Sequence, residues 1–356
     1  MSSIQVKLSF LRRLALPAAV LACVGGAAAG AALAVESLSD ADPSAAELPE
    51  TWERGANLTA FLPEAYASPS SRRAMLTARA AGTDLVALTP TSYMADATST
   101  EIAADPAKTP SDRSVLGAAR TAHELGLRVA IKPHVDVQDG TFRGEIAPSD
   151  RAAWFASYGE LVDRYADLAN EARAETLVIG TELTSMTGDE AAWRDLIARA
   201  RDRFDGEITF AANWVEGAEQ INFWDALDAI GIDAYMPLDP SNLEPSVDEL
   251  ITAWGPYVVR MADLSERWSR PVLFTELGYE SRVGTAARVE EGSAPLSESA
   301  QADAYRAAFG VLADEEWFGG IWWWEWSAEG LGIGPADGSF SPEGKRAALV
   351  LEEWQR

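Results

Sequence analysis

The chain has 356 residues and carries 29 Lys and Arg against 55 Asp and Glu, which gives a formal net charge of −26. Such a charge disfavours binding to nucleic acids and to anionic lipid headgroups. The single cysteine excludes a disulfide framework, and the presence of only two histidines excludes a metal site built from several histidines. Chemistry in this chain should therefore use carboxylates, and we expect neither a cofactor nor a metal ion.

Residues 1–34 predict export. A basic stretch that includes Lys7 and Arg12 precedes a long apolar run, and the small residues "ALA" at its end fit a cleavage site. The same run is long enough to remain as an uncleaved membrane anchor, and lipidation at Cys23 is a third alternative. We expect a periplasmic, extracellular or membrane-anchored protein. Residues 35–50 are acidic and aperiodic, which is typical of a linker.

From residue 51 onward, short apolar runs alternate with helical patterns. The eight predicted strands are residues 54–61, 84–90, 127–135, 176–183, 207–214, 229–237, 271–279 and 319–326. Most of them are nearly continuous apolar runs, as expected for parallel strands that are buried on both faces.

Eight amphipathic segments are predicted as helices between and after these strands. They are residues 68–82, 109–126, 148–173, 189–204, 218–229, 246–268, 297–314 and 341–354. Eight strands alternating with eight helices predict a (β/α)₈ TIM barrel, with residues 51–356 as a single catalytic domain. A doubly wound open sheet is the alternative, but it would require a glycine-rich first turn that "RGANLTAF" does not provide.

Two glutamates follow apolar strands in nearly identical contexts, Glu182 in "GTEL" and Glu276 in "FTEL". Catalytic groups of such barrels lie at the carboxyl ends of the strands, so the fourth and seventh strands would bring both carboxylates to one mouth. Two carboxylates are the usual apparatus of glycoside hydrolysis. A single Glu is most often a solvated or salt-bridged surface residue, but one that ends an apolar strand is costly unless it is paired or used.

Polar and aromatic residues end three further strands. His134 and Lys132 lie on the third, Asn213 and Trp214 end the fifth, and Tyr235 follows the sixth. We expect the histidine, asparagine and tyrosine to hydrogen-bond the carboxylates or sugar hydroxyls, and Trp214 is a candidate sugar wall. For Lys132, an ion pair with a barrel carboxylate and a contact with substrate remain equal alternatives.

Four other residues at strand ends carry weaker signals. Asp136 and Asp233 are candidate site acids, but aspartates in such places often cap the next element. Tyr93 and Met94 could line a subsite, and packing of the loop that holds them is the preferred interpretation.

Several of these motifs together resemble a known group of barrel glycosidases, which carry the acid/base on the fourth strand and the nucleophile on the seventh. The stretches are "VIGTELTSM", "GIDAYMPL", "PVLFTELGYES" and the Trp-rich last strand. "GTEL" together with "KPHV" is most similar to glycoside hydrolase family 113, whose known members are endo-β-1,4-mannanases. The resemblance covers residues 54–327. It implies that Glu182 is the acid/base, that Glu276 is the nucleophile with Tyr235 near it, and that His134 is a site residue.

The last predicted strand, residues 319–326, contains four tryptophans. Side chains alternate along a strand, so Trp322, Trp324 and Trp326 should share one face while Trp323 lies on the other. An indole face can cover the flat C–H patch of a sugar ring. The resemblance implies that Trp324 is such a platform, with Trp326 a candidate to extend it. For Trp323 we favour core packing.

The chain departs from the wider group at two positions. Thr181 stands before the acid/base where many members have an asparagine that contacts the sugar 2-hydroxyl, and Asn213 is a candidate to replace that contact. The second strand ends "LTPT", without the arginine found in several families. Both differences weaken the inference of the substrate.

The sequence thus predicts an exported, retaining glycoside hydrolase that acts by double displacement on a β-linked polysaccharide or oligosaccharide, with mannan favoured. One alternative is a β-glucanase or exo-glycosidase on the same barrel. Another is a non-hydrolytic carbohydrate-binding barrel, and a third is an envelope lipoprotein. We expect a monomer with a carbohydrate as its partner, no nucleic-acid partner, and a membrane tether only through the N-terminal segment.

Overall fold

The computed structural model describes residues 48–49, 51–238, 242–287 and 294–355. The predicted export segment and almost all of the predicted linker lie outside these residues, so they remain predictions. Among the helices of the described part, none is both long and apolar enough to cross a membrane.

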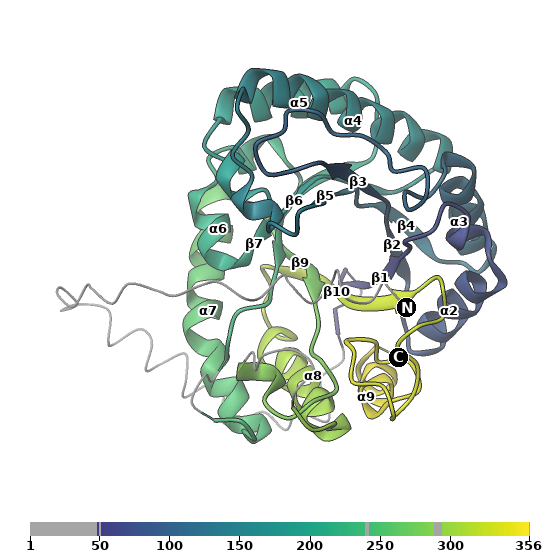
Figure 1. Cartoon of the computed structure of the whole chain (residues 1–356). Coiled ribbons are helices and arrows are strands. Elements are labelled where there is room, and N and C mark those ends of the chain that lie inside the picture. The colour runs from purple at the N-terminus through teal and green to yellow at the C-terminus, as the bar shows by residue number, and fades with distance from the viewer. Residues whose placement is uncertain (1–47, 50, 239–241, 288–293, 356) are drawn as a thin grey trace, which may run out of the picture.

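Eight parallel strands close into a barrel, and helices surround it (Figure 1). The order around the barrel is β1-β10-β9-β8-β7-β6-β4-β2. The strands are β1 (Glu53–Thr59), β2 (Leu85–Thr89), β4 (Arg128–Ile131), β6 (Thr176–Thr181), β7 (Glu207–Asn213), β8 (Ile230–Asp233), β9 (Val272–Leu277) and β10 (Phe318–Ser327). Each of the eight strands expected from the sequence has a counterpart in the barrel, and the TIM-barrel fold is confirmed.

The third predicted strand is wrong in one respect, because it is two strands. The barrel strand β4 ends at Ile131, and the chain resumes as β5 (His134–Val137) after Pro133. Proline lacks the N–H that a central strand must donate, so the barrel ladder breaks there. β5 pairs with β3 (Thr91–Met94), and this small parallel sheet extends from the carboxyl ends of β4 and β2.

Five helices of the outer layer begin at side-chain caps. Ser68, Ser111, Asp150 and Ser297 each accept a backbone N–H three residues on, and Ser246 forms a capping box with Glu249. The helices are α2 (Pro69–Ala80), α3 (Asp112–Glu124), α4 (Arg151–Ala172), α5 (Glu190–Arg201), α6 (Trp214–Gln220), α7 (Val247–Trp268), α8 (Glu298–Leu312) and α9 (Arg346–Trp354).

One predicted helix, residues 218–229, is placed wrongly. The observed α6 starts at Trp214, directly after β7, and only a short 3₁₀ turn, Trp224–Ala226, lies in the later part of the predicted segment. The apolar side chains of "INFWDAL" do pack inward, but from a loop and that short turn rather than from a continuous helix.

A small apolar cluster fills the barrel interior beneath the mouth. It contains Leu85, Ala87, Ala130, Val178, Ala211, Leu273 and Trp322. The indole of Trp322 takes the place that a side chain at position 55 would need, since a Cβ on Gly55 would lie 2.2 Å from its Cδ1. The larger apolar core lies between the strands and the helices. Several inward-facing rows continue with polar residues at the carboxyl ends, such as Lys132 after Ala130 and Thr275 after Leu273, and the candidate site lies there.

Candidate active site

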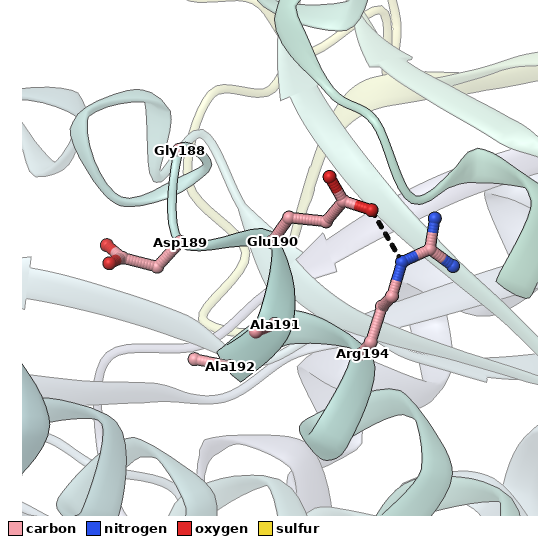
Figure 2. Close-up of a pocket in the computed structure, with 6 residues that line it drawn as sticks. All are labelled: Gly188, Asp189, Glu190, Ala191, Ala192 and Arg194. Atoms are coloured by element: carbon pink, nitrogen blue, oxygen red, sulfur yellow. Dashed lines mark hydrogen bonds and ion pairs between the residues drawn. The ribbon is translucent and has the colours of Figure 1, made fainter.

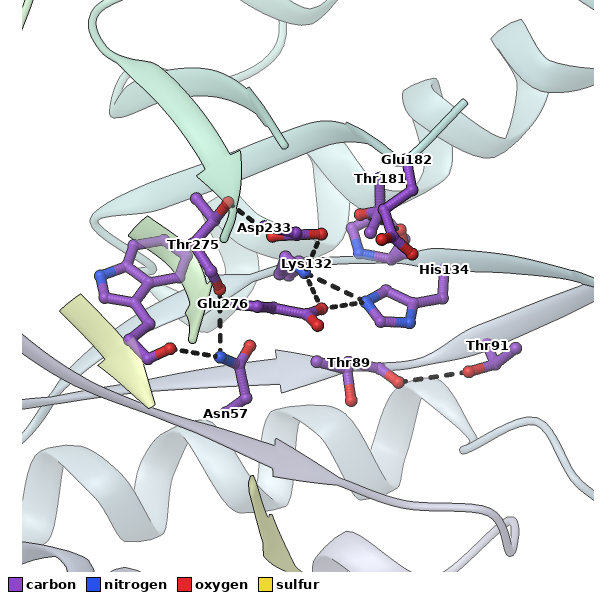
Figure 3. A network of polar contacts seen from close by, with 12 residues as sticks. Asn57, Thr89, Thr91, Lys132, His134, Thr181, Glu182, Asp233, Thr275 and Glu276 are labelled. Atoms are coloured by element: carbon purple, nitrogen blue, oxygen red, sulfur yellow. Dashed lines mark hydrogen bonds and ion pairs between the residues drawn. The ribbon is translucent and has the colours of Figure 1, made fainter. Parts of the chain in front are cut away.

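Glu276 lies on β9 and is the centre of a buried polar cluster (Figure 3). Its carboxylate accepts a hydrogen bond from Lys132 Nζ and another, at 2.9 Å, from the hydroxyl of Tyr235. The ring Nε2 of His134 lies 3.5 Å from the same carboxylate. The sequence predicted a donor from Tyr235, and that contact is present. Lys132 and Glu276 are both buried, so the contacts form out of water.

These contacts hold Glu276 ionised. Burial alone would raise its pKa, but the charge of Lys132 and the hydrogen bond from His134 lower the pKa to about 2. His134 is itself neutral at ordinary pH, because burial and then the charges of Arg143 and Lys132 lower its pKa to about 4. Tyr235 holds its proton, since burial and the charge of Glu276 raise its pKa well above 10.

Lys132 also meets a second carboxylate. Its Nζ lies 3.3 Å from Asp233 Oδ2, and the hydroxyl of Thr275 is 2.8 Å from the other oxygen of Asp233. Burial, followed by the charge of Glu276, raises the pKa of Asp233 well above its ordinary value. Thus Asp233 is no helix cap, and of the two alternatives for Lys132 the structure shows the ion pair. Asn57 closes this layer by donating to two backbone carbonyls, those of Thr275 and Trp322, each at 3.1 Å.

Glu182 follows β6 and takes a left-handed backbone conformation, with φ of 55°. It turns the chain out of the strand and directs the carboxylate toward the same space as Glu276 (Figure 3). One oxygen accepts a hydrogen bond of 3.1 Å from Arg143. Burial raises the pKa of Glu182 against the opposing charge of Arg143, and together with the charge of Glu276 it brings the pKa to about 7. The two glutamates therefore differ strongly in proton affinity.

Aromatic residues form the rim of this cluster. Trp324 is partly exposed, and its indole lies parallel to the ring of His134, with centroids 5.9 Å apart. Tyr235 packs edge-on against Phe340, which comes from the loop after β10. A partly exposed indole at the edge of this cluster is a surface on which a sugar ring could stack.

Asn213 and Trp214 lie at the end of β7, one strand away from Glu182. Asn213 is in register with Asp233 of the neighbouring strand. Asn213 and Trp214 are both partly exposed. Trp214 has φ of 60° and packs partly against the outer core as it begins α6. The structure thus places both residues on the same mouth as the glutamates, and their contacts with a sugar remain predictions.

The expected alternation of the tryptophans is wrong beyond Trp324. Trp322 points into the barrel, as expected, and Trp323 packs outward in a stack on Tyr305, with centroids 3.9 Å apart. Trp326, however, lies in the outer core with Trp323. The pairing with β1 shifts register between Trp323 and Trp326, which face residues only two apart on β1. This irregularity resets which face each side chain takes, so Trp326 cannot extend the platform.

Sequence reasoning missed Arg143 altogether. It lies in a 3₁₀ turn, Arg143–Glu145, in the connection between β5 and α4. Its guanidinium is buried and bonds Glu182, Asp136 and the carbonyl of Val135. A single arginine in a polar loop gives no local signal, because its contact with Glu182 spans 39 positions.

A separate surface hollow lies where α5 begins (Figure 2). It is lined by Gly188, Asp189, Glu190, Ala191, Ala192 and Arg194. Glu190 and Arg194 are joined across it by an ion pair of 2.7 Å. This hollow is open, and none of the cluster around Glu276 contributes to it. Among the described residues, no group of three or more His, Cys, Asp or Glu side chains is arranged to hold a metal ion.

Comparison with known proteins agrees with this geometry. The model of Glycoside Hydrolase Family 113 matches residues 61–339, which is most of the chain. The chain belongs to glycoside hydrolase family 113. It is accordingly a glycoside hydrolase whose substrate is a carbohydrate, and the resemblance inferred from "GTEL" and "KPHV" is confirmed.

Solved structures of this family are similar over nearly the whole barrel. The chain is 30% identical to the family 113 β-mannanase from Alicyclobacillus acidocaldarius, covering 88% of this chain and 98% of that one, with a TM-score of 0.76. A second structure, described as a family 113 β-1,4-mannanase, is 24% identical over 85% of this chain and 98% of its own, with a TM-score of 0.78.

More distant structures share the fold alone. A β-glucuronidase from Ruminococcus gnavus is 14% identical over 88% of this chain and 53% of its own length, with a TM-score of 0.58. No curated protein sequence matches the chain.

Proposed function

We propose that this family 113 enzyme is a retaining β-mannanase in which Glu276 is the nucleophile and Glu182 the general acid/base. The observation that carries the proposal is the unequal environment of the two carboxylates. Glu276 is bound by a buried ammonium and a phenol, whereas Glu182 is a largely buried carboxyl whose pKa is raised to about 7. Two carboxylates with separated proton affinities have the properties that an acid and a nucleophile need.

In the first step, an oxygen of Glu276 attacks the anomeric carbon and forms a glycosyl ester. The bond from that carbon to the leaving oxygen breaks, and the leaving oxygen takes the proton of Glu182. In the second step, Glu182 removes a proton from water, and the water oxygen replaces Glu276 at the anomeric carbon. The carboxylate and the proton are thereby restored. Tyr235 and Lys132 favour Glu276 as a leaving carboxylate, because both stabilise its charged form.

The substrate class rests on the relatives. Two similar family 113 structures are described as β-mannanases, and the partly exposed Trp324 supplies a flat apolar surface beside the carboxylates. We therefore infer a β-1,4-linked mannan or manno-oligosaccharide. Side-by-side hydrolysis of defined manno- and gluco-oligosaccharides tests this point, with faster turnover of the manno series expected. Comparable rates on the gluco series would contradict it.

The mechanism is tested by NMR of the first product from a β-linked manno-oligosaccharide. The β-anomer should form first and then mutarotate. An initial α-anomer would show an inverting reaction and would remove the nucleophile role from Glu276.

Added azide then separates the two roles in variants. In the Glu182→Ala enzyme, azide should attack the glycosyl ester and yield a β-glycosyl azide from substrates with good leaving groups. In the Glu276→Ala enzyme no ester can form, so any azide product should be the α-anomer. The opposite pattern would exchange the two assignments.

A further inference from the structure

Arg143, in the loop between β5 and α4, contacts the Glu182 carboxylate. Its guanidinium makes three directed hydrogen bonds: Nε to the carbonyl of Val135 at 3.1 Å, one terminal nitrogen to Glu182 at 3.1 Å, and the other to Asp136. The Arg143 side chain is only 10% exposed, so its guanidinium group has little freedom to leave this geometry.

The loop itself is shaped to bring the arginine this close. A Cβ added to Gly144 would lie 3.1 Å from the backbone oxygen of Glu182 and 2.4 Å from the ring of Phe142. Glycine at position 144 is thus what lets the Arg143 turn lie directly on the end of β6. Because the carbonyl of Val135 holds Nε, the guanidinium position is set by β5 as well as by the carboxylates.

Arg143 and Asp136 act on the proton affinity of Glu182 in opposite directions. The arginine cation favours an ionised Glu182, while the negative charge of Asp136 opposes ionisation. Asp136 is 27% exposed at its side chain, so it links the buried pair to solvent. The titratable groups that face Glu182 from the packed elements are Arg143, Asp136, Lys132, His134, Asp233, Tyr235 and Glu276. Of these, Arg143 alone among the described residues has a hydrogen bond to its carboxylate.

We propose that Arg143 and Asp136 form a positioning pair that aims the Glu182 carboxyl and sets the pH at which it gives up its proton. This inference rests on the proposed acid/base role of Glu182. Arg143 lowers the proton affinity of Glu182, and Asp136 partly cancels that effect. The balance keeps Glu182 protonated near neutral pH and still able to ionise when the leaving group departs.

The test is the pH profile of kcat/KM, whose basic limb reports the loss of the Glu182 proton in the free enzyme. The parent enzyme should have that limb near pH 7. Arg143→Met removes an adjacent cation, so the limb should move to higher pH by about one unit or more. Asp136→Asn removes an anion, so the limb should move to lower pH by a smaller amount.

A matched pair of variants controls for the change of net charge. Arg164 and Asp112 form an exposed ion pair of 2.7 Å between α4 and α3. Arg164→Met and Asp112→Asn make the same charge changes there and should leave the basic limb in place. Arg143→Lys keeps the positive charge but loses the planar guanidinium group with its several N–H donors. The basic limb of its pH profile should therefore stay near that of the parent enzyme. Its kcat/KM should fall several-fold more for substrates with poor leaving groups than for those with good ones.

The outcomes distinguish this inference from the function on which it rests. Suppose that azide yields a β-glycosyl azide with Glu182→Ala, which supports the acid/base role. If the basic limbs of Arg143→Met and Asp136→Asn then coincide with that of the parent, or shift in the same direction, the positioning pair is overturned while the proposed function stands. If Arg143→Met does not fold, the downward shift in Asp136→Asn and the leaving-group dependence of Arg143→Lys still decide. Failure of the azide reaction would overturn the acid/base role, and this inference with it.

Discussion

Replacement of Lys132 by methionine should lower the free energy of unfolding and should move the acid limb of the kcat/KM pH profile to higher pH. Lys132 is fully buried and is shared by Glu276 and Asp233. Methionine keeps the apolar stem and removes the charge. Two carboxylates are then left in one buried place without their cation, and breaking a buried ion pair typically costs about 3–5 kcal/mol.

The pKa of Glu276 gives an independent magnitude. Its folded value of about 2, against an ordinary value of 4.5, corresponds to about 3 kcal/mol of stability. Because the folded pKa is depressed, that stability is fully present above pH 4.5 and is lost as the pH falls toward about 2. Without Lys132 this contribution disappears, and burial opposes ionisation instead. The loss should therefore be about 3 kcal/mol at pH 7 and should shrink below about pH 4.

The assay combines denaturant unfolding at pH 7 and pH 3.5 with the acid limb of kcat/KM. The acid limb reports the ionisation of Glu276. In Lys132→Met its midpoint should move to higher pH by about two units or more. Arg128→Met is the matched control, because Arg128 also bridges two carboxylates, Glu53 and Asp84, but at the amino ends of the strands. It should lower stability and leave the limb unmoved. An equal stability loss at both pH values, with an unmoved limb in Lys132→Met, would refute an electrostatic role.

Two further predictions concern the tryptophans of β10 and the hydroxyl of Tyr235 that donates to Glu276. Trp324→Ala should lower kcat/KM by at least about tenfold, roughly 1.4 kcal/mol, with little change in unfolding free energy. Trp323→Ala should instead lower the unfolding free energy by about 3–5 kcal/mol, since that ring is fully buried and stacked on Tyr305. If activity responds to Trp323→Ala and stability to Trp324→Ala, the faces of β10 are misassigned. Tyr235→Phe removes one hydrogen bond to a buried carboxylate, so kcat should fall by roughly tenfold or more and the acid limb should rise. An unchanged acid limb in Tyr235→Phe would mean that the phenol does not stabilise charged Glu276.

The barrel could be predicted because its signals are local. Buried parallel strands are apolar runs of a few residues, and helix starts such as Ser246 carry their own capping residues. The failures have physical causes that leave no local trace. Trp214 starts α6 at a positive φ straight after a strand, which no propensity favours. The faces of Trp324 and Trp326 depend on a register shift against β1, which is a property of the pair of strands.

The candidate site was predictable in its carboxylates and less so in their partners. Glu182 and Glu276 stand out because each ends an apolar strand. Arg143 gives no signal and Asp233 only a weak one, since an arginine in a loop and an aspartate at a strand end are ordinary features. Their significance lies in contacts that span 39 and 101 positions, to Glu182 and Lys132 respectively.

Two glutamates in the same "TEL" context have opposite proton affinities, and the surrounding cations show why. Each carboxylate meets one cation, and each cation is shared with an aspartate, Asp136 beside Arg143 and Asp233 beside Lys132. The sharing of a cation with an aspartate therefore cannot by itself explain why the two glutamates differ in pKa. Burial is the largest influence on both pKa values. At Glu276 the charge of Lys132 and then the hydrogen bond from His134 outweigh it, whereas at Glu182 the charge of Arg143 does not. It follows that the ammonium of Lys132 and the donors around Glu276 together divide the two roles, and that removing them should bring the two pKa values together.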